Sequence, residues 1–157
     1  GLIKVQQVPA NRYAYYLTPQ GFAEKTRLTA SYLSYSFNFF RGARDQCATE
    51  LNNCIRQNWR RIAFAGVSDL GEIAALCAND SPLETVGYFD PSSEQHQFAG
   101  KPVFLKFQDI PVFDAVLITD LNNPQGMFDL LAKSLPSDRI RAPGLLSISR
   151  EPPELME

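Results

Sequence analysis

Residue types that commonly carry chemistry are scarce in this chain. Its 157 residues include one histidine and three cysteines, which are Cys47, Cys54 and Cys77. An odd number of cysteines without a Cys-x-x-Cys pair argues against a disulfide framework and against a zinc ribbon. A single histidine cannot build a multi-histidine metal site. We therefore expect three reduced, buried thiols and no bound metal.

Long apolar runs are also missing. No run approaches the roughly 20 residues that a helix needs to span a bilayer, and no secretory signal precedes the first expected strand. These absences predict a soluble, cytoplasmic protein with no membrane partner. Gly1 stands where an initiator methionine would, so we expect the natural protein to extend further toward its N-terminus.

Charge is unevenly distributed along the chain. Residues 1 to 60 carry 8 Lys or Arg and 3 Asp or Glu, whereas residues 61 to 157 carry 7 and 14. A basic segment joined to an acidic one is compatible with nucleic-acid contact through the basic segment, because phosphate neutralisation supplies most nonspecific affinity. A solvated helix face would give the same distribution, so both interpretations stay open.

The first 18 residues have the pattern of a β-hairpin. Residues 2 to 7 alternate roughly between apolar and polar types, residues 13 to 17 are rich in strand-forming aromatics, and turn residues separate the two runs. Thr18 and Pro19 then provide an N-cap and a proline at the first helical position, and no proline follows before Pro82. A long linker or dimerisation helix is therefore expected over residues 19 to 59.

Within this expected helix, residues recur at alternating spacings of four and three, which is the pattern of a coiled-coil seam. A seam predicts a homodimer through residues 19 to 58, although a helix that lies on its own domain is an open alternative. At about 1.5 Å per residue the helix would be about 60 Å long, more than a small domain covers. The seam positions are Leu33, Phe37, Phe40, Arg44, Cys47, Leu51 and Cys54.

The first 35 residues resemble a known family. They contain Gly1-Leu2-Ile3, a basic turn, the run Tyr15-Tyr16-Leu17-Thr18-Pro19-Gln20-Gly21 and then Glu24-Lys25. This order is similar to the wing and the following helix of MarR-type winged-helix transcriptional regulators. The resemblance implies that Lys4, Asn11 and Arg12 contact DNA, and an ordinary charged hairpin tip is the alternative. The helix-turn-helix of that family would precede Gly1, so DNA is expected as a partner of the full-length protein only.

From Arg60 onward, expected strands alternate with helices over short connections. This pattern predicts an α/β fold, with a five-stranded parallel Rossmann-like sheet in residues 60 to 150 and a tail over 151 to 157. Right-handed crossovers favour the strand order 3-2-1-4-5. The expected strands are 61–65, 84–89, 102–104, 115–119 and 145–148, and the expected helices are 70–79, 125–134 and a short piece near 107–110.

The first of these strands leads into a turn that resembles a dinucleotide-binding loop. Serine replaces the second of the three glycines in that fingerprint. Asp90 ends the second strand, where an acidic residue would hold a ribose hydroxyl, whereas Asp69 places negative charge beside the phosphate position. Nucleotide binding and a structural turn that binds nothing are equal alternatives, and a carboxylate filling the loop would favour the second. The candidate binding residues are Gly66, Ser68, Asp69, Leu70, Gly71 and Asp90.

Residues 61 to 150 resemble a second family. The runs RIAFAGVSDLGEIAAL, LETVGYFDP and FDAVLITD are similar to the N-terminal Rossmann-like domain of nucleotide-sugar dehydratases and sugar acetyltransferases of bacterial polysaccharide synthesis. The resemblance implies NAD(P) or a nucleotide sugar as the ligand. The chain departs from that family at Ser68 and Pro91.

Groups that would support catalysis are few. His96 lies in a polar segment typical of a surface loop, Cys77 occupies an apolar helix position, and no Tyr-x-x-x-Lys pair occurs. We therefore predict that the protein is not an enzyme. The expected function is that of a transcriptional regulator fragment with a Rossmann-like effector-sensing domain. An oxidoreductase-like domain that binds NAD(P) or a nucleotide sugar, and a dimerisation module that binds nothing, are the alternatives.

Overall fold

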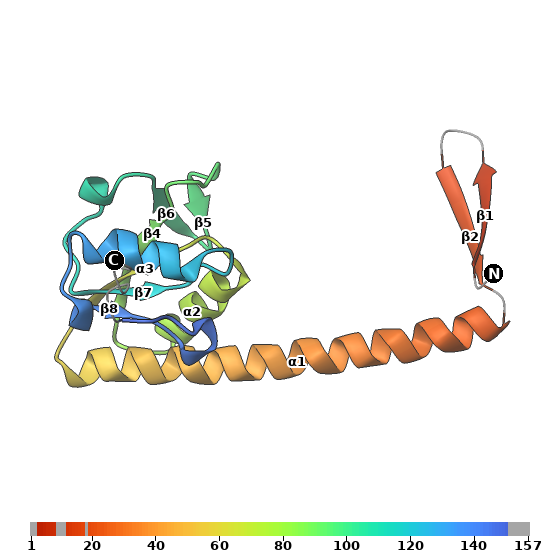
Figure 1. Ribbon diagram of the computed structural model, residues 1–157, viewed down its shortest axis with the longest axis horizontal. Coiled ribbons are helices and arrows are strands. Elements are labelled where there is room, and N and C mark those ends of the chain that lie inside the picture. The colour runs from red at the N-terminus through yellow and green to blue at the C-terminus, as the bar shows by residue number, and fades with distance from the viewer. Residues whose placement is uncertain (1–2, 9–11, 18, 151–157) are drawn as a thin grey trace, which may run out of the picture. The chain divides into compact units, whose positions relative to one another are not determined.

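The computed structural model describes residues 3–8, 12–17 and 19–150 (Figure 1). The chain divides into two compact units, Gly1–Phe40 and Arg41–Glu157. Helix α1, Pro19–Arg56, contributes residues to both units.

The first unit contains a two-stranded antiparallel hairpin and the beginning of α1. Strand β1 covers Ile3–Val8 and strand β2 covers Arg12–Leu17, and the pairing runs from Ile3 opposite Leu17 to Val8 opposite Arg12. The hairpin and the long helix therefore occur where the sequence predicts them. Proline at the first position of α1 loses nothing, because the N–H that it lacks would have no acceptor within the helix.

The second unit is a Rossmann-like α/β domain built on a six-stranded, mostly parallel sheet. The strand order is β5-β6-β4-β3-β7-β8. Its first four parallel strands have the predicted order 3-2-1-4, and β8 is a fifth parallel strand at the predicted edge, although other residues form it. The antiparallel edge strand β5 was not predicted. The strands are β3 Arg61–Ala65, β4 Glu84–Phe89, β5 Gln97–Phe98, β6 Lys101–Phe104, β7 Ala115–Ile118 and β8 Ile140–Arg141.

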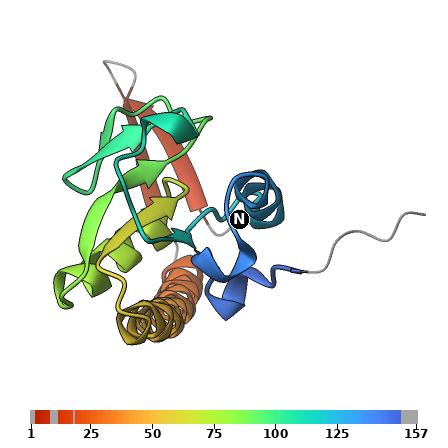
Figure 2. The ribbon, with the colours of Figure 1, turned by 90° about the vertical axis from the view of Figure 1, so that its left-hand side faces the viewer.

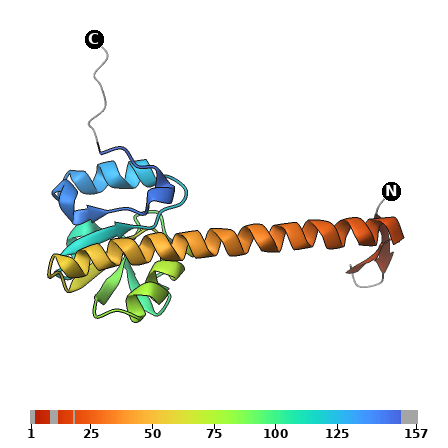
Figure 3. The same cartoon turned by 90° about the horizontal axis from the view of Figure 1, so that it is seen from below.

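Helices cover both faces of this sheet. On β3, Ile62 and Phe64 join the core shared with α2, Asp69–Asn79, and with the last turns of α1, whereas Ala63 and Ala65 join the core under α3, Pro124–Ala132. This alternation follows from the period of two in a strand. Figure 2 shows α1 and α3 on opposite sides of the sheet, and Figure 3 shows α1 beside α2.

The seam predicted for α1 is wrong for its C-terminal half. Cys47, Leu51 and Cys54 are buried in the core of the second unit, so they are not available to a partner helix. Arg44 is exposed, as a charged side chain at the edge of this contact should be. The alternative of a helix that lies on its own domain is therefore correct for these three positions. The side chain of Leu33 lies outside the described residues.

The predicted fifth strand is also wrong. The parallel strand at this edge is β8, Ile140–Arg141. The first two residues of the predicted strand, Leu145 and Leu146, instead belong to the 3₁₀ helix η3, Gly144–Leu146. Ser147 ends that helix in the left-handed region, with φ of 53°, which breaks an extended run. Two other 3₁₀ helices complete the domain, η1 Phe107–Asp109 and η2 Ser137–Arg139.

Among the described residues, no helix combines the length and the apolar character that crossing a membrane would require.

Candidate functional site

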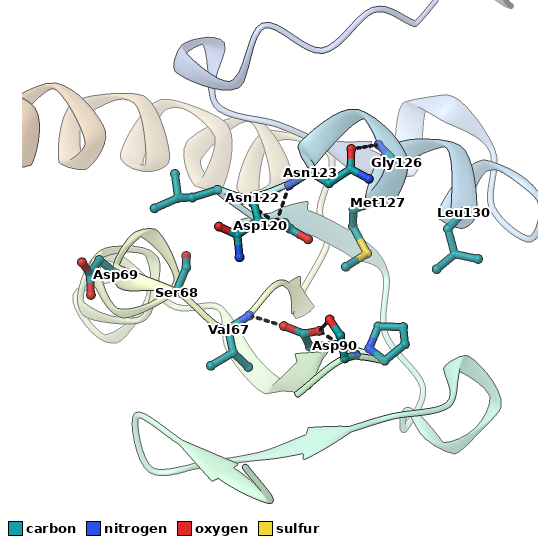
Figure 4. A pocket seen from close by; sticks show the side chains of 13 residues that line it. Val67, Ser68, Asp69, Asp90, Asp120, Asn122, Asn123, Gly126, Met127 and Leu130 are labelled. Carbon is teal, nitrogen blue, oxygen red and sulfur yellow. Dashed lines mark hydrogen bonds between the residues drawn. The ribbon is translucent and has the colours of Figure 1, made fainter. Parts of the chain in front are cut away.

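A crevice of about 580 Å³ lies at the carboxyl ends of β3, β4 and β7 (Figure 4). Three loops form it, and they span residues 67–69, 90–92 and 120–123, with α3 closing one side. The chain passes from β3 to β4 on one side of β3 and later returns to β7 on the other side. Open α/β sheets bind their ligands at such a change of strand order.

The turn after β3 requires glycine at position 66. Gly66 has φ of +122°, and a Cβ atom there would lie 2.5 Å from the Cα of Asp120. Its N–H donates to the carbonyl of Phe89 at 3.0 Å, and its own carbonyl accepts from the Thr119 hydroxyl at 2.6 Å. The first glycine of the fingerprint therefore makes the tight turn that the sequence predicts.

Ser68 caps helix α2. Its backbone is extended, and its Oγ accepts a hydrogen bond from the N–H of Gly71 at 3.2 Å while its hydroxyl donates to the carbonyl of Thr119. The Ser68 hydroxyl therefore acts as both a donor and an acceptor within the protein. Serine at this position supplies the helix cap that the glycine of the fingerprint lacks.

The other fingerprint residues at the start of α2 have different surroundings. A Cβ at Gly71 would lie 3.0 Å from the Tyr88 ring and 3.1 Å from the carbonyl oxygen of Gly66, so glycine allows the close packing of helix on strand. The Tyr88 hydroxyl donates to the Gly71 carbonyl at 2.7 Å. Leu70 is buried in the core and does not line the crevice, whereas Asp69 is exposed and does.

Asp90 follows β4 and is bonded to the turn after β3. Its Oδ2 accepts from the N–H of Val67 at 3.0 Å, and its Oδ1 accepts from the N–H and the hydroxyl of Ser92, both at 3.0 Å. The residue is 9% exposed. Asp90 therefore lies at the crevice, as predicted, but both of its carboxylate oxygens already have partners within the chain.

A second capped helix starts at the same crevice. Asn123 caps α3, because its Oδ1 accepts from the N–H of Gly126 at 3.1 Å. Before it, Oδ1 of Asp120 accepts from the N–H groups of Asn122 and Asn123 at 2.8 and 3.0 Å. A Cβ at Gly126 would lie 2.3 Å from Nδ2 of Asn123, so a larger residue there would displace the capping side chain.

The third loop, residues 120–123, was not among the residues predicted from the sequence. The run Thr119-Asp120-Leu121-Asn122-Asn123-Pro124 places polar residues and an Asn-Pro helix start directly after a buried strand. Because parallel strands end at the same edge of a sheet, that pattern was sufficient to assign these side chains to the site.

The crevice is acidic on one side and apolar on the other. Asp69, Asp90 and Asp120 contribute carboxylates, and none of the described residues that line it is Lys or Arg. The side chains of Met127 and Leu130 form the apolar wall from α3 (Figure 4). The N-termini of α2 and α3 contribute partial positive charge, which falls off within the first turn of each helix.

A dinucleotide does not fit this arrangement well. A pyrophosphate is normally held by loop N–H groups and a helix N-terminus free of competing anions. Here the Val67 N–H is bonded to Asp90 and the Gly71 N–H to Ser68. A phosphate would also approach the buried carboxylate of Asp90. The implied NAD(P) or nucleotide-sugar ligand stays a prediction that these residues do not favour.

Nucleophilic and metal-binding groups lie elsewhere or are deactivated. His96 is exposed and does not line the crevice. Burial raises the pKa of Cys47 to about 12 and that of Cys54 to about 11, and it also raises the pKa of Cys77, so neutral thiols predominate at pH 7. In the part of the chain that the structure describes, no three His, Cys, Asp or Glu side chains are grouped to hold a metal ion.

Two of the three predicted DNA-contact residues lie on the described strands of the hairpin. Lys4 is opposite Tyr16 on β1, and Arg12 is opposite Val8 at the start of β2. Asn11 falls outside the described residues. Contact of these residues with DNA stays a prediction.

Comparisons of the chain with protein-family models, with curated proteins and with solved structures give no match.

Proposed function

We propose that this chain is the effector-sensing part of a transcriptional regulator, in which the crevice binds a small molecule and α1 carries the response toward the hairpin. The observation that carries the proposal is the crevice itself. It lies where α/β domains bind ligands, and two capped helices start at it. A ligand that binds one of two arrangements of the domain more tightly would shift the equilibrium toward that arrangement. The size of the shift is set by the difference between its affinities for the two arrangements.

A series of hydrogen bonds supports a connection from the crevice to α1. Gln125, in the first turn of α3, pairs with Ser149 through two hydrogen bonds of 3.0 and 2.8 Å. In the same C-terminal segment, the N–H of Leu145 donates to Oε1 of Gln46 on α1 at 2.6 Å. A ligand that moves the start of α3 would therefore also move residues 145–149, which are hydrogen-bonded to α1.

The proposal includes a homodimer through α1. Four aromatic side chains of this helix are exposed, and the stretch from 31 to 40 contains no charged residue. A second copy of the chain would cover these side chains and would set the distance between two hairpins. The exposed aromatics are Tyr35, Phe37, Phe39 and Phe40.

DNA contact is proposed for the full-length protein, with Lys4, Asn11 and Arg12 on the wing. The basic N-terminal segment supports this part, together with the order of hairpin and helix. The coding sequence upstream of Gly1 tests it directly. We expect it to encode a helix-turn-helix, and an unrelated segment there would contradict the regulator proposal.

Binding by the extended protein provides the functional test. Fluorescence anisotropy with DNA from its own promoter should give an affinity that falls steeply with salt. Replacing both Lys4 and Arg12 by Ala should weaken binding and reduce the salt dependence, whereas replacing Lys133 by Ala, an exposed position after α3, should leave both unchanged. Equal losses in the two variants would contradict a wing contact.

One observation favours a second candidate, a dimerisation module whose turn binds nothing. The carboxylate of Asp90 accepts the hydrogen bond from the N–H of Val67, so this N–H is not available to a ligand. In that case no small molecule would raise the melting temperature of the domain or change the amide spectrum of residues 67–69, 90–92 and 120–123. A ligand-induced change confined to these loops would instead support the sensing proposal.

A further inference from the structure

We infer that the crevice excludes phosphate-bearing ligands and takes a small organic cation. The inference rests on the proposed function, because it names the class of molecule that the sensing crevice would bind. It departs from the ligand that a Rossmann-like turn ordinarily implies.

The position of an anion is filled from within the chain. Oδ2 of Asp90 accepts from the N–H of Val67 in the turn after β3, and Oδ1 accepts two hydrogen bonds from Ser92. Asp90 is nine-tenths buried, so its charge is only weakly screened by water. A phosphate group entering the loop would meet this carboxylate and would find the Val67 N–H already bonded.

The remaining carboxylates can accept hydrogen bonds from a ligand. Oδ1 of Asp120 accepts the two N–H bonds of its turn, but its Oδ2 accepts none from any residue that the structure describes. Figure 4 shows the Asp120 side chain between the start of α3 and Asp90. The exposed carboxylate of Asp69 lies at the edge of the same crevice. With no Lys or Arg in the lining, the charge of the three carboxylates exceeds the partial positive charge of the two helix N-termini, and the balance favours a cation.

The shape of the crevice favours an organic cation over a metal ion. The described residues do not group three acidic, His or Cys side chains closely enough to hold a metal. A volume of about 580 Å³ is that of a small-molecule site. The side chains of Met127 and Leu130 offer an apolar wall, so a molecule with a hydrocarbon part and an ammonium or guanidinium group matches both sides.

Amide NMR titration of the whole chain tests this inference with three probes. They are agmatine, an organic dication, and NAD⁺ and inorganic pyrophosphate, which are anionic. We expect agmatine to shift the amides of Val67, Asn122 and Gly126, and we expect the two anions at the same concentration to leave them in place. Replacing Asp120 by Asn should weaken agmatine binding about tenfold or more, because a hydrogen bond to a charged group is lost.

Matched variants separate local contact from overall charge. Asp120→Asn keeps an oxygen that can accept the turn N–H bonds, so the loop should stay intact. Asp109→Asn makes the same charge change at an exposed position on η1, outside the crevice, and should leave the agmatine affinity unchanged. Equal weakening in both variants, or none in Asp120→Asn, would overturn the inference, because agmatine would then be held by general surface charge.

Two further outcomes also overturn it. If NAD⁺ or pyrophosphate shifts the Val67 amide at a lower concentration than agmatine, the ligand class is wrong although the crevice still binds a small molecule. If no probe shifts any crevice amide, the cation site does not exist. Neither outcome affects the upstream-sequence test, which decides the regulator proposal separately.

Discussion

Two parts of helix α1 share one apolar repeat but have different surroundings. Between Arg41 and Arg56, Cys47, Leu51 and Cys54 are 0%, 2% and 1% exposed. Ahead of Arg41 the same repeat continues with Phe37 and Phe40, which are 59% and 39% exposed. One part is core of the α/β domain, whereas the other presents aromatic side chains that the described residues leave uncovered.

The difference shows that spacing alone does not identify the partner of an apolar stripe. The buried part is also fixed by polar contacts, since Gln46 accepts from the N–H of Leu145 and Glu50 pairs with Arg141. These contacts attach the C-terminal part of α1 to the domain that contains the crevice. The aromatic part is then free to pair with a second copy, which is the arrangement that the proposed function requires.

Thiol reactivity should distinguish the two parts most strongly. Burial raises the pKa of Cys47 to about 12 and of Cys54 to about 11, and only the thiolate reacts. A cysteine introduced by Asn38→Cys, at an exposed position of the same helix, should have a pKa of about 8.5. At pH 8 it should react with iodoacetamide more than about a hundredfold faster than either buried thiol. Well below pH 8.5 all three rates should rise about tenfold per pH unit. Comparable rates for the introduced cysteine and for Cys47 and Cys54 would contradict the burial of the C-terminal part of α1.

Leu51→Ala should cause the largest loss of stability. The side chain is 2% exposed in the core between α1 and the sheet. Its truncation should lower the free energy of unfolding by about 2 to 5 kcal/mol, because a cavity replaces buried methyl groups. Urea unfolding measures this change. Phe37→Ala is the matched truncation in the exposed part, and it should cost less than Leu51→Ala when both are measured at a concentration where the chain is monomeric.

The ion pair between α1 and β8 should contribute less. Nε of Arg141 lies 2.8 Å from Oε2 of Glu50, and the two side chains are 26% and 19% exposed. A double-mutant cycle with Glu50→Ala and Arg141→Ala should give a coupling free energy of about 1 to 2 kcal/mol. A coupling near zero would mean that the apolar contacts alone hold this end of α1.

The smallest effect on folding is expected from the exposed aromatics. Replacing Phe37 and Phe40 together by Ser should change the free energy of unfolding of the α/β domain by about 0.5 kcal/mol or less, because neither side chain contributes to its core. Urea unfolding at low protein concentration measures this. A loss as large as that of Leu51→Ala would place the aromatic part in the same core and would remove the contrast.

The central strands of the domain were predictable from the sequence. Residues 61–65 and 84–89 form β3 and β4 with the predicted bounds, because strands buried on both faces are continuous apolar runs. Helix α2 was predictable within one residue, since Ser68 caps it and a buried glycine lies in its first turn. Strong local patterns of this kind agree with the tertiary fold.

Short edge elements were not predictable. Strands β5 and β8 contain two residues each, so neither has a pattern long enough to recognise. The apolar residues Leu145 and Leu146 favoured a strand, but they form part of η3 and pack against the core beside the sheet. Their conformation depends on tertiary contacts, among them the hydrogen bond to Gln46.

The candidate site was predictable in position but not in orientation. Gly66 was assignable because its turn needs a positive φ, and Asp90 was placed at the correct strand end. No sequence pattern showed that the Asp90 carboxylate turns inward to the N–H of Val67. The choice between an inward and an outward carboxylate depends on which donors the fold brings near, and that choice decides the expected ligand.

The mass of the chain in solution tests most directly whether α1 is domain core at one end and a dimer contact at the other. Light scattering of the wild-type chain should give about twice 17.6 kDa, and the double variant with Phe37→Ser and Phe40→Ser should give 17.6 kDa with an unchanged domain. A wild-type mass of 17.6 kDa at every concentration would contradict the account.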